Sequence, residues 1–566
     1  MRRPLRAALP PLLLLLLAMM CCAGGCLAAA RRCVFDEVVR KCGSPPAAVV
    51  REVPRKGQGA TQAYTVATPE ADGEWRPIRV LASTRDLEDP EKHCSAVDDV
   101  RPDFLGGTGV CLKEHLMTRN ILFAMTNNII PGAIGLHSSR LLVRRVRRVL
   151  MVPPFNAGML CSEFSVPVEH YSPGIADADL VLYVGAGPSS VSWALACATE
   201  GGRPFVGGLH IAVPDCLLAR LAVRIVAHEV AHALGFNYQQ MAGLRMVSND
   251  TTLPGGGRAV VTTAETKKQV QAHYSCSRLD GMELQTTAGG APQSHWTWRS
   301  AKDELMSEFL GEGGGLYTAL TMAVFADMPF YKVRWEMAEP MSWGNGSGCG
   351  LLEGKSAPES IAGYSNMFCD VADQSLRCTS DRNFVGRCTS VATSDCSGNG
   401  GSGCSFVASF LHEGTAEGGL RSFCADRNVE FLPGGRTGIY SWCLDAESLT
   451  VTAGNGSRVE QEQDVGGVCA QVMCDKGKVW VRYLGNNTWH DCRAGGFIAP
   501  ASPAFKDGGR IWCPEYSAVC TIAPDGSSFV TPGRPDAAVR ATQLWPLMFF
   551  VLFYILLVAV VAAAPL

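Results

Sequence analysis

The sequence predicts an α+β fold, in which a mixed helix and strand region is followed by a disulfide-rich C-terminal domain of strands and loops. Strand-like apolar runs and two helix-like runs lie before about residue 340. From Cys349 to Cys520 the chain holds 13 of its 24 cysteines, with many Gly and Ser and few long periodic runs. A chain of 566 residues is expected to form two or three domains, because single cores seldom exceed about 250–300 residues.

Composition and the N-terminus together indicate the secretory pathway. The net charge of −3 gives no reason to expect nucleic acid or an acidic membrane surface as a partner. Twenty-four cysteines favour an oxidising compartment. Basic residues, an apolar run and small residues predict a signal peptide, residues 1–30, that is cleaved. Four sequons are candidates for glycosylation, at Asn249, Asn345, Asn455 and Asn486.

The C-terminus predicts attachment to a membrane. No charged residue follows Arg540, and the tail 544–566 is apolar enough to span a bilayer. It has no basic flank, which a retained transmembrane helix would normally have. Small residues at 524–528, a spacer within 523–543 and the tail together resemble a glycosylphosphatidylinositol (GPI) attachment signal. Under either interpretation the protein is displayed on the extracellular face of the plasma membrane.

Apolar periodicity predicts the elements of the N-terminal region. Four runs are strand-like, at 78–83, 141–152, 179–186 and 207–213. Residues 220–234 read as a helix that ends at Gly235, and 316–328 as a second helix. Residues 250–290, rich in Gly and Thr, are expected to be a loop-rich insertion. The alternating Val and Arg of 144–148 favour a strand with a solvated face over a glycan-binding or processing site.

The first predicted helix carries a pattern typical of metal-dependent hydrolysis. His228 and His232 are four residues apart, so a helix presents both imidazoles on one face to one ion. Glu229 is turned away from both, where it can take a proton from a water acidified by the metal. The helix is otherwise largely apolar, and burying these three side chains without a partner would be costly. A metal ion would be that partner.

The third ligand must come from elsewhere in the chain. Tyr238 stands where a histidine would complete the longer signature HExxHxxGxxH. Among the remaining histidines, His93 and His490 are more simply surface or loop residues, and alternation in its strand would turn His210 outward. His295 stands out through its context, SHWTWRSAKDELMSE. Spacing alone leaves the choice open.

Several stretches resemble leishmanolysin, the surface metalloprotease family of trypanosomatids. They are STRDLEDPEKHC, HEVAHALGF, SHWTWRSAKDELM, YTALTMAVFADMPFY and WGNGSGC, in order between about residues 80 and 520. The resemblance implies a metzincin-like catalytic domain with a segment inserted between the second and third zinc histidines. It implies that His295 is the third ligand of one zinc ion per chain, and that Met306 is the Met-turn methionine. Met322 is the alternative, but its context reads as a helix core.

The resemblance also implies a pro-segment cysteine that holds the enzyme latent. Cys33 lies in RRCVFDE, just after the predicted signal cleavage, and a thiolate is a strong zinc ligand. The alternative is a local disulfide between Cys33 and Cys42. From Cys94 onward there are 19 cysteines, an odd number, and Cys216 is one candidate for the free thiol.

The sequence therefore predicts a zinc-dependent endopeptidase of the cell surface that cleaves proteins or peptides, with host extracellular or complement proteins as candidate partners. The alternative is a catalytically decayed adhesion or immune-decoy protein on the same scaffold. Convergence of His295 and Glu229 on one cavity would discriminate between them. The strand at 207–213 is expected to be the edge that pairs with extended substrate, unless it is an interior strand.

These expectations divide the chain into seven segments. They are the signal peptide 1–30, a pro-segment 31–60, an N-terminal catalytic subdomain 61–235, a central subdomain 236–340, a cysteine-rich domain 341–522, a spacer 523–543 and the apolar tail 544–566.

Overall fold

The computed structural model describes most of the chain between residues 33 and 530. The described residues are 33–42, 48–49, 75–145, 149–217, 219–250, 258–287, 289–308, 313–353, 364, 367–391, 404–409, 422–427, 432–453 and 458–530. The expected signal peptide and apolar tail lie outside them. Within them, no helix combines the length and the apolar character needed to cross a membrane.

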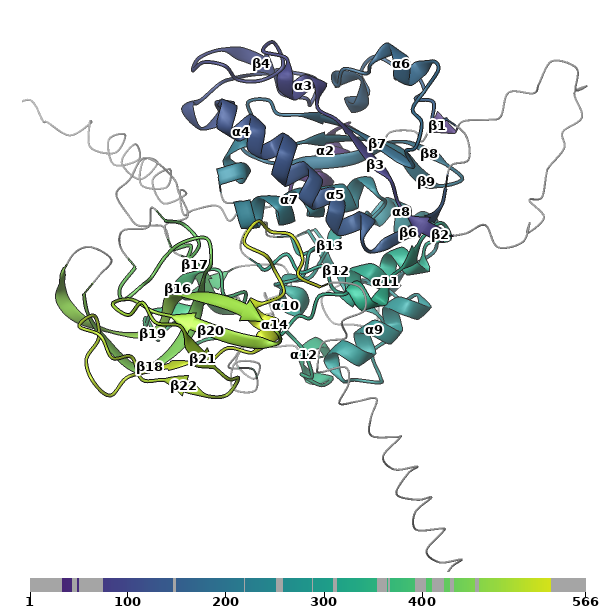
Figure 1. The fold of residues 1–566 in the computed structure, drawn as a ribbon. Coiled ribbons are helices and arrows are strands. Elements are labelled where there is room, and N and C mark those ends of the chain that lie inside the picture. The colour runs from purple at the N-terminus through teal and green to yellow at the C-terminus, as the bar shows by residue number, and fades with distance from the viewer. Residues whose placement is uncertain are drawn as a thin grey trace, which may run out of the picture.

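A five-stranded sheet forms the upper body of the molecule (Figure 1). Its strand order is β1 (Ala48–Val49), β8 (Trp193–Glu200), β9 (Arg203–His210), β7 (Leu180–Gly185) and β3 (Val80–Ser83). β7 runs parallel to both of its neighbours and is fully buried, whereas β8 is antiparallel to β9. The expectation that 207–213 forms an edge was wrong, because β8 and β7 flank β9 on its two sides. β8 is nearest the edge and pairs with β1 only at Ala198 and Thr199.

Helix α7, Ala219–Ala233, packs against β8, β9 and the helix α5, Ile130–Ser138. It confirms the predicted helix at 220–234. The helix ends in a Schellman motif, in which Phe236 N donates to Ala231 O at 2.9 Å and Gly235 N to His232 O at 3.1 Å. The motif needs a positive φ, and Gly235 supplies it at +114°. The chain therefore turns back immediately after the second histidine.

The segment that follows α7 is more ordered than its composition suggests. A four-stranded sheet runs through β10 (Val247–Asp250), β11 (Arg258–Val261), β12 (Met282–Thr286) and β13 (Pro292–Trp296). Helix α9, Ala264–Tyr274, lies between β11 and β12 in the chain. The expectation of a loop-rich 250–290 was therefore wrong for the described residues. Ala, Glu, Lys and Gln in AETKKQVQAHY favour a helix, and the β-branched Val and Thr on either side favour strands.

The other predicted elements were recovered with shorter bounds. The second helix, α11, covers Ala319–Asp327, and strand β6 covers only Leu141–Arg144 of the predicted 141–152. Residues 146–148 of the basic stretch are outside the described residues. Short elements complete this half of the molecule, namely α3 (Arg85–Glu88), α4 (Arg119–Ala124), α6 (Val168–Tyr171), α8 (Tyr238–Gly243), α10 (Trp298–Ala301), α12 (Gly350–Glu353), β2 (Trp75–Pro77) and β14 (Lys332–Val333).

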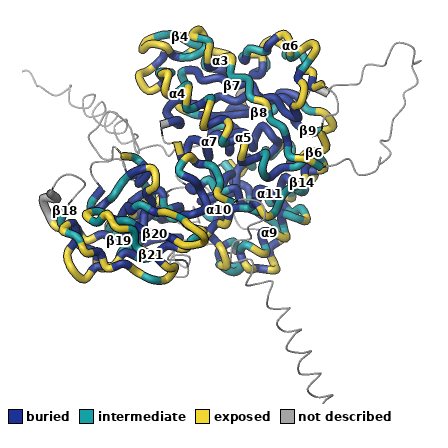
Figure 2. Tube along the Cα trace, viewed as in Figure 1, coloured by how far each residue is buried: buried dark blue, intermediate teal, exposed yellow. Residues whose placement is uncertain are grey.

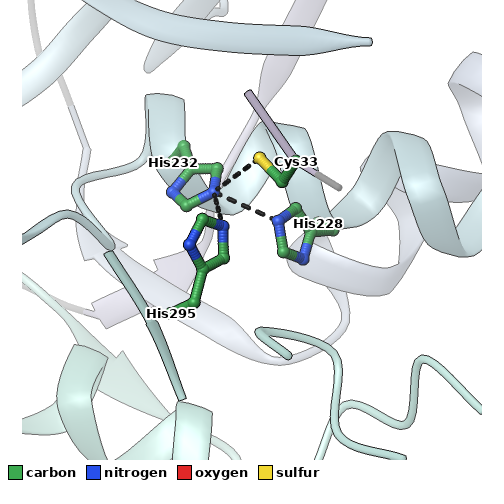
Figure 3. A group of neighbouring side chains, drawn as sticks. All are labelled: Cys33, His228, His232 and His295. Carbon is green, nitrogen blue, oxygen red and sulfur yellow. Dashed lines mark hydrogen bonds between the residues drawn. The ribbon is translucent and has the colours of Figure 1, made fainter. Parts of the chain in front are cut away.

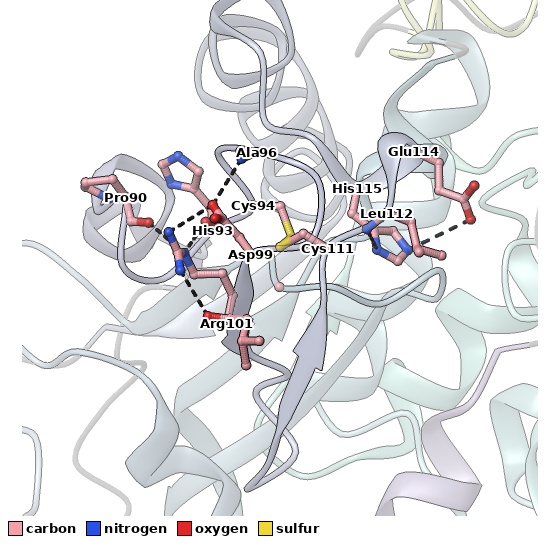
Figure 4. Close-up of a disulfide and its surroundings, with 12 residues drawn as sticks. Pro90, His93, Cys94, Ala96, Asp99, Arg101, Cys111, Leu112, Glu114 and His115 are labelled. Carbon is pink, nitrogen blue, oxygen red and sulfur yellow. Dashed lines mark hydrogen bonds and ion pairs between the residues drawn. A yellow bond between two sulfur atoms is a disulfide. The ribbon is translucent and has the colours of Figure 1, made fainter.

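A disulfide closes the hairpin of β4 (Val100–Pro102) and β5 (Thr108–Val110), as Figure 4 shows. Cys94 and Cys111 form the bond, and the Arg101 guanidinium donates to the carbonyl oxygen of His93 at 3.1 Å. His93 is thus part of a surface loop, as its sequence context indicates.

The C-terminal region is a disulfide-rich β domain, which confirms the predicted class. Its six-stranded sheet has the order β21-β20-β19-β18-β23-β22, and two long strands, β18 (Ser441–Ala453) and β19 (Arg458–Asp475), form its centre. The remaining strands of the domain are β15 (Arg377–Cys378), β16 (Val385–Val391), β17 (Cys404–Ser409), β20 (Lys478–Arg482), β21 (His490–Cys492), β22 (Phe497–Ile498) and β23 (Arg510–Trp512). Disulfides of this region join Cys369–Cys388, Cys378–Cys443, Cys424–Cys469, Cys474–Cys520 and Cys492–Cys513.

The C-terminal region is tied to helix α7 by two buried arginines. Arg220 Nη2 donates to Ile439 O at 2.7 Å, and its guanidinium lies 4.0 Å from the centre of the Trp442 ring. Arg224 Nε donates to Gly526 O at 2.7 Å, and its other nitrogens pair with the buried Glu339. Figure 2 shows that the trace around α7 is largely buried. The helix with the two histidines is therefore held by the C-terminal region as well as by β8, β9 and α5.

Candidate metal centre

Three histidines from two elements converge at one buried point (Figure 3). His228 and His232 lie on one face of α7, and His295 lies on β13. The Nε2 atom of His232 is 3.1 Å from Nε2 of His228 and 3.2 Å from Nε2 of His295. All three side chains are buried. The structure thus brings together the two helical histidines and the third one, which is 63 residues further along the chain.

The second ring nitrogens of the helical histidines are held by backbone carbonyls. His228 Nδ1 is 2.6 Å from Leu305 O, and His232 Nδ1 is 2.7 Å from Phe236 O. A carbonyl accepts, so each Nδ1 carries the proton and each Nε2 presents a lone pair. Burial, with a smaller contribution from His295, lowers the pKa of His228 to about 3, and the Leu305 carbonyl opposes this shift. Neutral imidazoles are the form that binds a metal.

Cys33 completes the group as a free, buried thiol. Its Sγ lies 3.6 Å from His232 Nε2, and one ligand atom from each of the four residues lies within 4.8 Å of the others. Burial, and then the charge of Glu229, raises the pKa of this thiol well above its usual value, a shift that a bound cation would reverse. The alternative of a Cys33–Cys42 disulfide is wrong. Cys216 is also a free, buried thiol.

The three separations from His232 Nε2 fit zinc. Zn–N bonds of about 2.0–2.1 Å and a Zn–S bond of about 2.3 Å in a tetrahedron put nitrogens about 3.4 Å apart and sulfur about 3.6 Å from nitrogen. The separations here are 3.1 and 3.2 Å between nitrogens and 3.6 Å from sulfur to nitrogen. Lone pairs that meet so closely in a buried place repel each other unless a cation lies between them. Imidazole nitrogen and thiolate sulfur are both ligands that zinc prefers.

The short helix after Cys33, α2 (Phe35–Cys42), anchors the thiol. The Phe35 ring stacks on the His232 ring, with 4.1 Å between centroids and 7° between planes. Asp36 accepts hydrogen bonds from Ser294 N at 2.8 Å and Ser294 Oγ at 2.7 Å. Asp36 Oδ2 also lies 3.3 Å from His295 Nδ1. Burial raises the pKa of Asp36, but the contacts with His295 and Ser294 outweigh it and leave this pKa below its usual value.

Glu229 lies beside the histidines and not among them. Its Oε2 is 3.7 Å from Cys33 Sγ, which belongs to the same group as His295. Burial raises the pKa of Glu229 well above its usual value; the charge of Asp215 adds to the rise, whereas the Cys33 thiol and the Ala194 backbone oppose it. A buried carboxylate next to a metal position is suited to take and return a proton.

Met306 lies in a tight turn next to the strand of the third histidine. Its carbonyl accepts from Trp296 N at 2.9 Å, and its own N–H donates to Glu304 Oε2 at 2.7 Å. The preceding residue, Leu305, supplies the carbonyl that holds His228. Met322 is buried in α11, as a helix-core residue would be.

The structure places the other candidate residues away from the metal centre. His210 is fully buried, so the expectation that it faces outward was wrong. Its ring lies against Phe104 and stacks on Trp193, Gly187 N donates to its Nε2 at 2.9 Å, and burial lowers its pKa to about 4. Asn345 is exposed, and Asn486 is partly buried and donates to Tyr483. The side chain of Asn249 and all of Asn455 lie outside the described residues.

Sequence reasoning missed polar residues that adjoin the third histidine and the Met306 turn. Asp36, Ser294 and Glu304 adjoin residues that were singled out, but no spacing rule connects Asp36 with Ser294, which is 258 residues away. The sequence feature that could have pointed to Asp36 is the pair of acidic residues that follows Cys33 in CVFDE.

Comparisons with known proteins agree with this geometry. The family model described as leishmanolysin matches residues 31–398 and 420–526. The chain is 30% identical to leishmanolysin of Leishmania major over 504 residues, which cover 84% of this chain and 81% of that protein. It is 30% identical to a leishmanolysin homolog of Crithidia fasciculata, covering 79% and 71%, and 25% identical to a leishmanolysin-like peptidase of Drosophila melanogaster, covering 38% and 40%. The chain therefore belongs to the leishmanolysin family of zinc metalloproteases and is a metalloendopeptidase.

Proposed function

We propose that this chain hydrolyses internal peptide bonds at one zinc ion held by His228, His232 and His295, with Glu229 as the proton-transfer group. The observation that carries the proposal is the convergence of three buried histidines, with Glu229 in contact with the Cys33 thiol of the same group. Zinc, when bound, supplies an acidified water and polarises the scissile carbonyl. The fold is then a metzincin-like catalytic domain, with the segment from 236 to 294 inserted between the second and third ligands.

The protein side chains supply the proton transfers and the orientation. Glu229 takes the proton of the attacking water and passes it to the leaving amine. The carbonyls of Leu305 and Phe236 fix the two helical imidazoles so that Nε2 faces the ion. Met306 belongs to the turn that also supplies the Leu305 carbonyl, and we assign it the position beneath the metal.

Strand β8 is the proposed docking edge for an extended substrate. It is antiparallel to its neighbour β9, and the backbone of Ala194, near its start, lies close enough to Glu229 to affect its pKa. β1, downstream of α2, pairs with β8 at Ala198 and Thr199. The pro-segment therefore lies along part of the edge that a substrate would use, as well as over the metal position.

Latency follows from the same contacts. Cys33 takes the fourth ligand position, where the water would bind, and Phe35 covers the outer face of His232. Removal of residues 31–60 would open the fourth ligand position and uncover the His232 ring.

A cleaved signal 1–30 and a GPI signal at the C-terminus would place the enzyme, glycosylated, on the cell surface. There host extracellular or complement proteins are proposed substrates or adhesion partners. The domain boundaries are proposed as the sequence places them, at about 60, 235, 340 and 522.

The test uses protein that lacks the signal and the tail, with zinc per chain and peptide hydrolysis measured before and after a thiol-reactive mercurial. The wild type should bind one zinc and become active on mercurial treatment. Glu229→Ala should keep the zinc and lose hydrolysis by about 10²–10⁴-fold or more. His295→Ala should lose both. Full hydrolysis by Glu229→Ala would refute the assigned role.

A further inference from the structure

We propose that Asp36 of the pro-segment is a positioning residue for the third metal ligand, so that the pro-segment helps to build the zinc site that it also blocks. The inference rests on the proposed function, because it takes His295 as a zinc ligand. It goes further in giving the pro-segment a constructive role, separate from the thiol of Cys33.

The three histidines differ in what holds their second nitrogen. His228 and His232 donate Nδ1–H to the carbonyls of Leu305 and Phe236, which belong to the catalytic body and stay after activation. His295 Nδ1 is buried and makes no hydrogen bond of good geometry within the described residues; the acceptor that faces it is Asp36 Oδ2, at 3.3 Å. The third ligand therefore takes its orienting partner from the removable segment.

Asp36 is itself held firmly enough to orient a ring. Its two oxygens accept from Ser294 N and Ser294 Oγ, at 2.8 and 2.7 Å. The Ser294 oxygen in turn accepts from Tyr238 N at 3.0 Å. Phe35, the preceding residue, stacks on His232. These contacts link α2 to the strand of the third ligand and to the segment just after α7.

A carboxylate on the far nitrogen of a ligand histidine fixes the tautomer and makes the ring a better donor, and its loss typically costs about 10–100-fold in metal affinity. The benefit is greatest for His295, because this ligand is on a strand and is not paired with another histidine on the same helix. Metal binding is coupled to folding, so the proenzyme should take up zinc more tightly than the processed enzyme.

The experiment compares Asp36→Asn with Glu37→Gln in the pro-form. The two changes remove one negative charge each from adjacent residues, and Glu37 is exposed. Both are made in a Cys33→Ser background, so that the thiolate does not mask the effect. Zinc affinity is measured by competition with a chelator, and the visible spectrum of the cobalt-substituted protein reports ligand geometry.

Asp36→Asn should weaken zinc binding by about 10–100-fold and shift the cobalt spectrum, whereas Glu37→Gln should stay within about twofold of its parent. Ser294→Ala, which keeps the carboxylate but removes one of its anchors, should fall between them, and it serves as the test if Asp36→Asn fails to fold. Equal affinities and spectra in all variants would overturn this inference alone. A parent that binds no zinc would instead overturn the proposed function.

Discussion

At the scale of single residues, buried histidines outside the metal centre link stability to pH. His137 is fully buried against α7, where its Nε2 donates to Ala227 O at 2.8 Å and its Nδ1 lies 3.1 Å from the Tyr317 hydroxyl. Burial lowers its pKa to about 4, and the charge of Arg140 adds to this, while the Ala227 carbonyl opposes it. The folded protein therefore holds this ring neutral.

The sign of the pH effect follows from this lowered pKa. Between about pH 6.5 and 4 the unfolded chain binds a proton at His137 that the folded chain does not, so stability falls as the pH falls. At pH 5 the loss from this group is on the order of 2 kcal/mol. His137→Gln should reduce the stability difference between pH 7 and pH 5 by about that amount, measured by urea unfolding. An unchanged difference would mean that His137 does not titrate in this range.

Residue-level prediction from the sequence succeeded where the chemistry is local. His228, Glu229 and His232 lie within five positions on one helix, so periodicity and residue type suffice to propose a metal site. His295 could be chosen only through family resemblance, because its position depends on how the β10–β13 sheet folds back. Asp36 and Ser294 meet across 258 residues, and no local rule predicts such a contact.

At the scale of elements, the end of α7 determines where the second histidine points. The turn at Gly235 brings the Phe236 carbonyl to 2.7 Å from His232 Nδ1. A side chain at Gly235 would meet no atom nearer than 3.6 Å, so its cost comes from the φ of +114°. A change in the backbone at Gly235 would therefore also change the orientation of the His232 ring.

Gly235→Ala should destabilise the protein by about 1–3 kcal/mol and also weaken zinc binding, because the strained turn would move the Phe236 carbonyl. Gly243→Ala, at the end of α8, is the matched control. It has an ordinary φ and open space around the added carbon, so it should be neutral or slightly stabilising. Thermal unfolding and chelator competition would measure both effects. A neutral Gly235→Ala would show that the turn tolerates other geometries.

Element prediction failed where composition and periodicity disagreed. Residues 250–290 looked loop-rich because of their Gly and Thr, yet α9 and the strands around it form part of a sheet that ends in the strand of His295. Strand 207–213 was read as an edge, but the edge position depends on strand order, which a single strand does not encode.

At the scale of the whole molecule, the C-terminal domain supports the catalytic helix. Arg220 reaches from α7 to the carbonyls of Ile439 and Ser441 and to the ring of Trp442. Cysteine content predicted the class of this domain, but nothing local in the sequence predicted its contact with α7. Burial lowers the pKa of Arg220 to about 9, which leaves the side chain charged at neutral pH.

Arg220→Ala should cost about 3–5 kcal/mol, because it leaves buried carbonyls without a donor and a cavity beside Trp442. The C-terminal domain should then unfold separately, as a second transition in calorimetry. Arg510→Ala, which removes a half-exposed arginine facing Glu447 at 3.8 Å, should change little. One transition at the wild-type temperature for Arg220→Ala would show that the domain is held by other contacts.

The central claim is that one zinc ion is bound by three imidazoles and the pro-segment thiolate in the latent protein. X-ray absorption at the zinc edge of the intact pro-form tests it directly. The account predicts three nitrogen neighbours at about 2.0–2.1 Å and one sulfur at about 2.3 Å, with the sulfur lost in Cys33→Ser. A zinc with no sulfur neighbour, or with two or more, would contradict it.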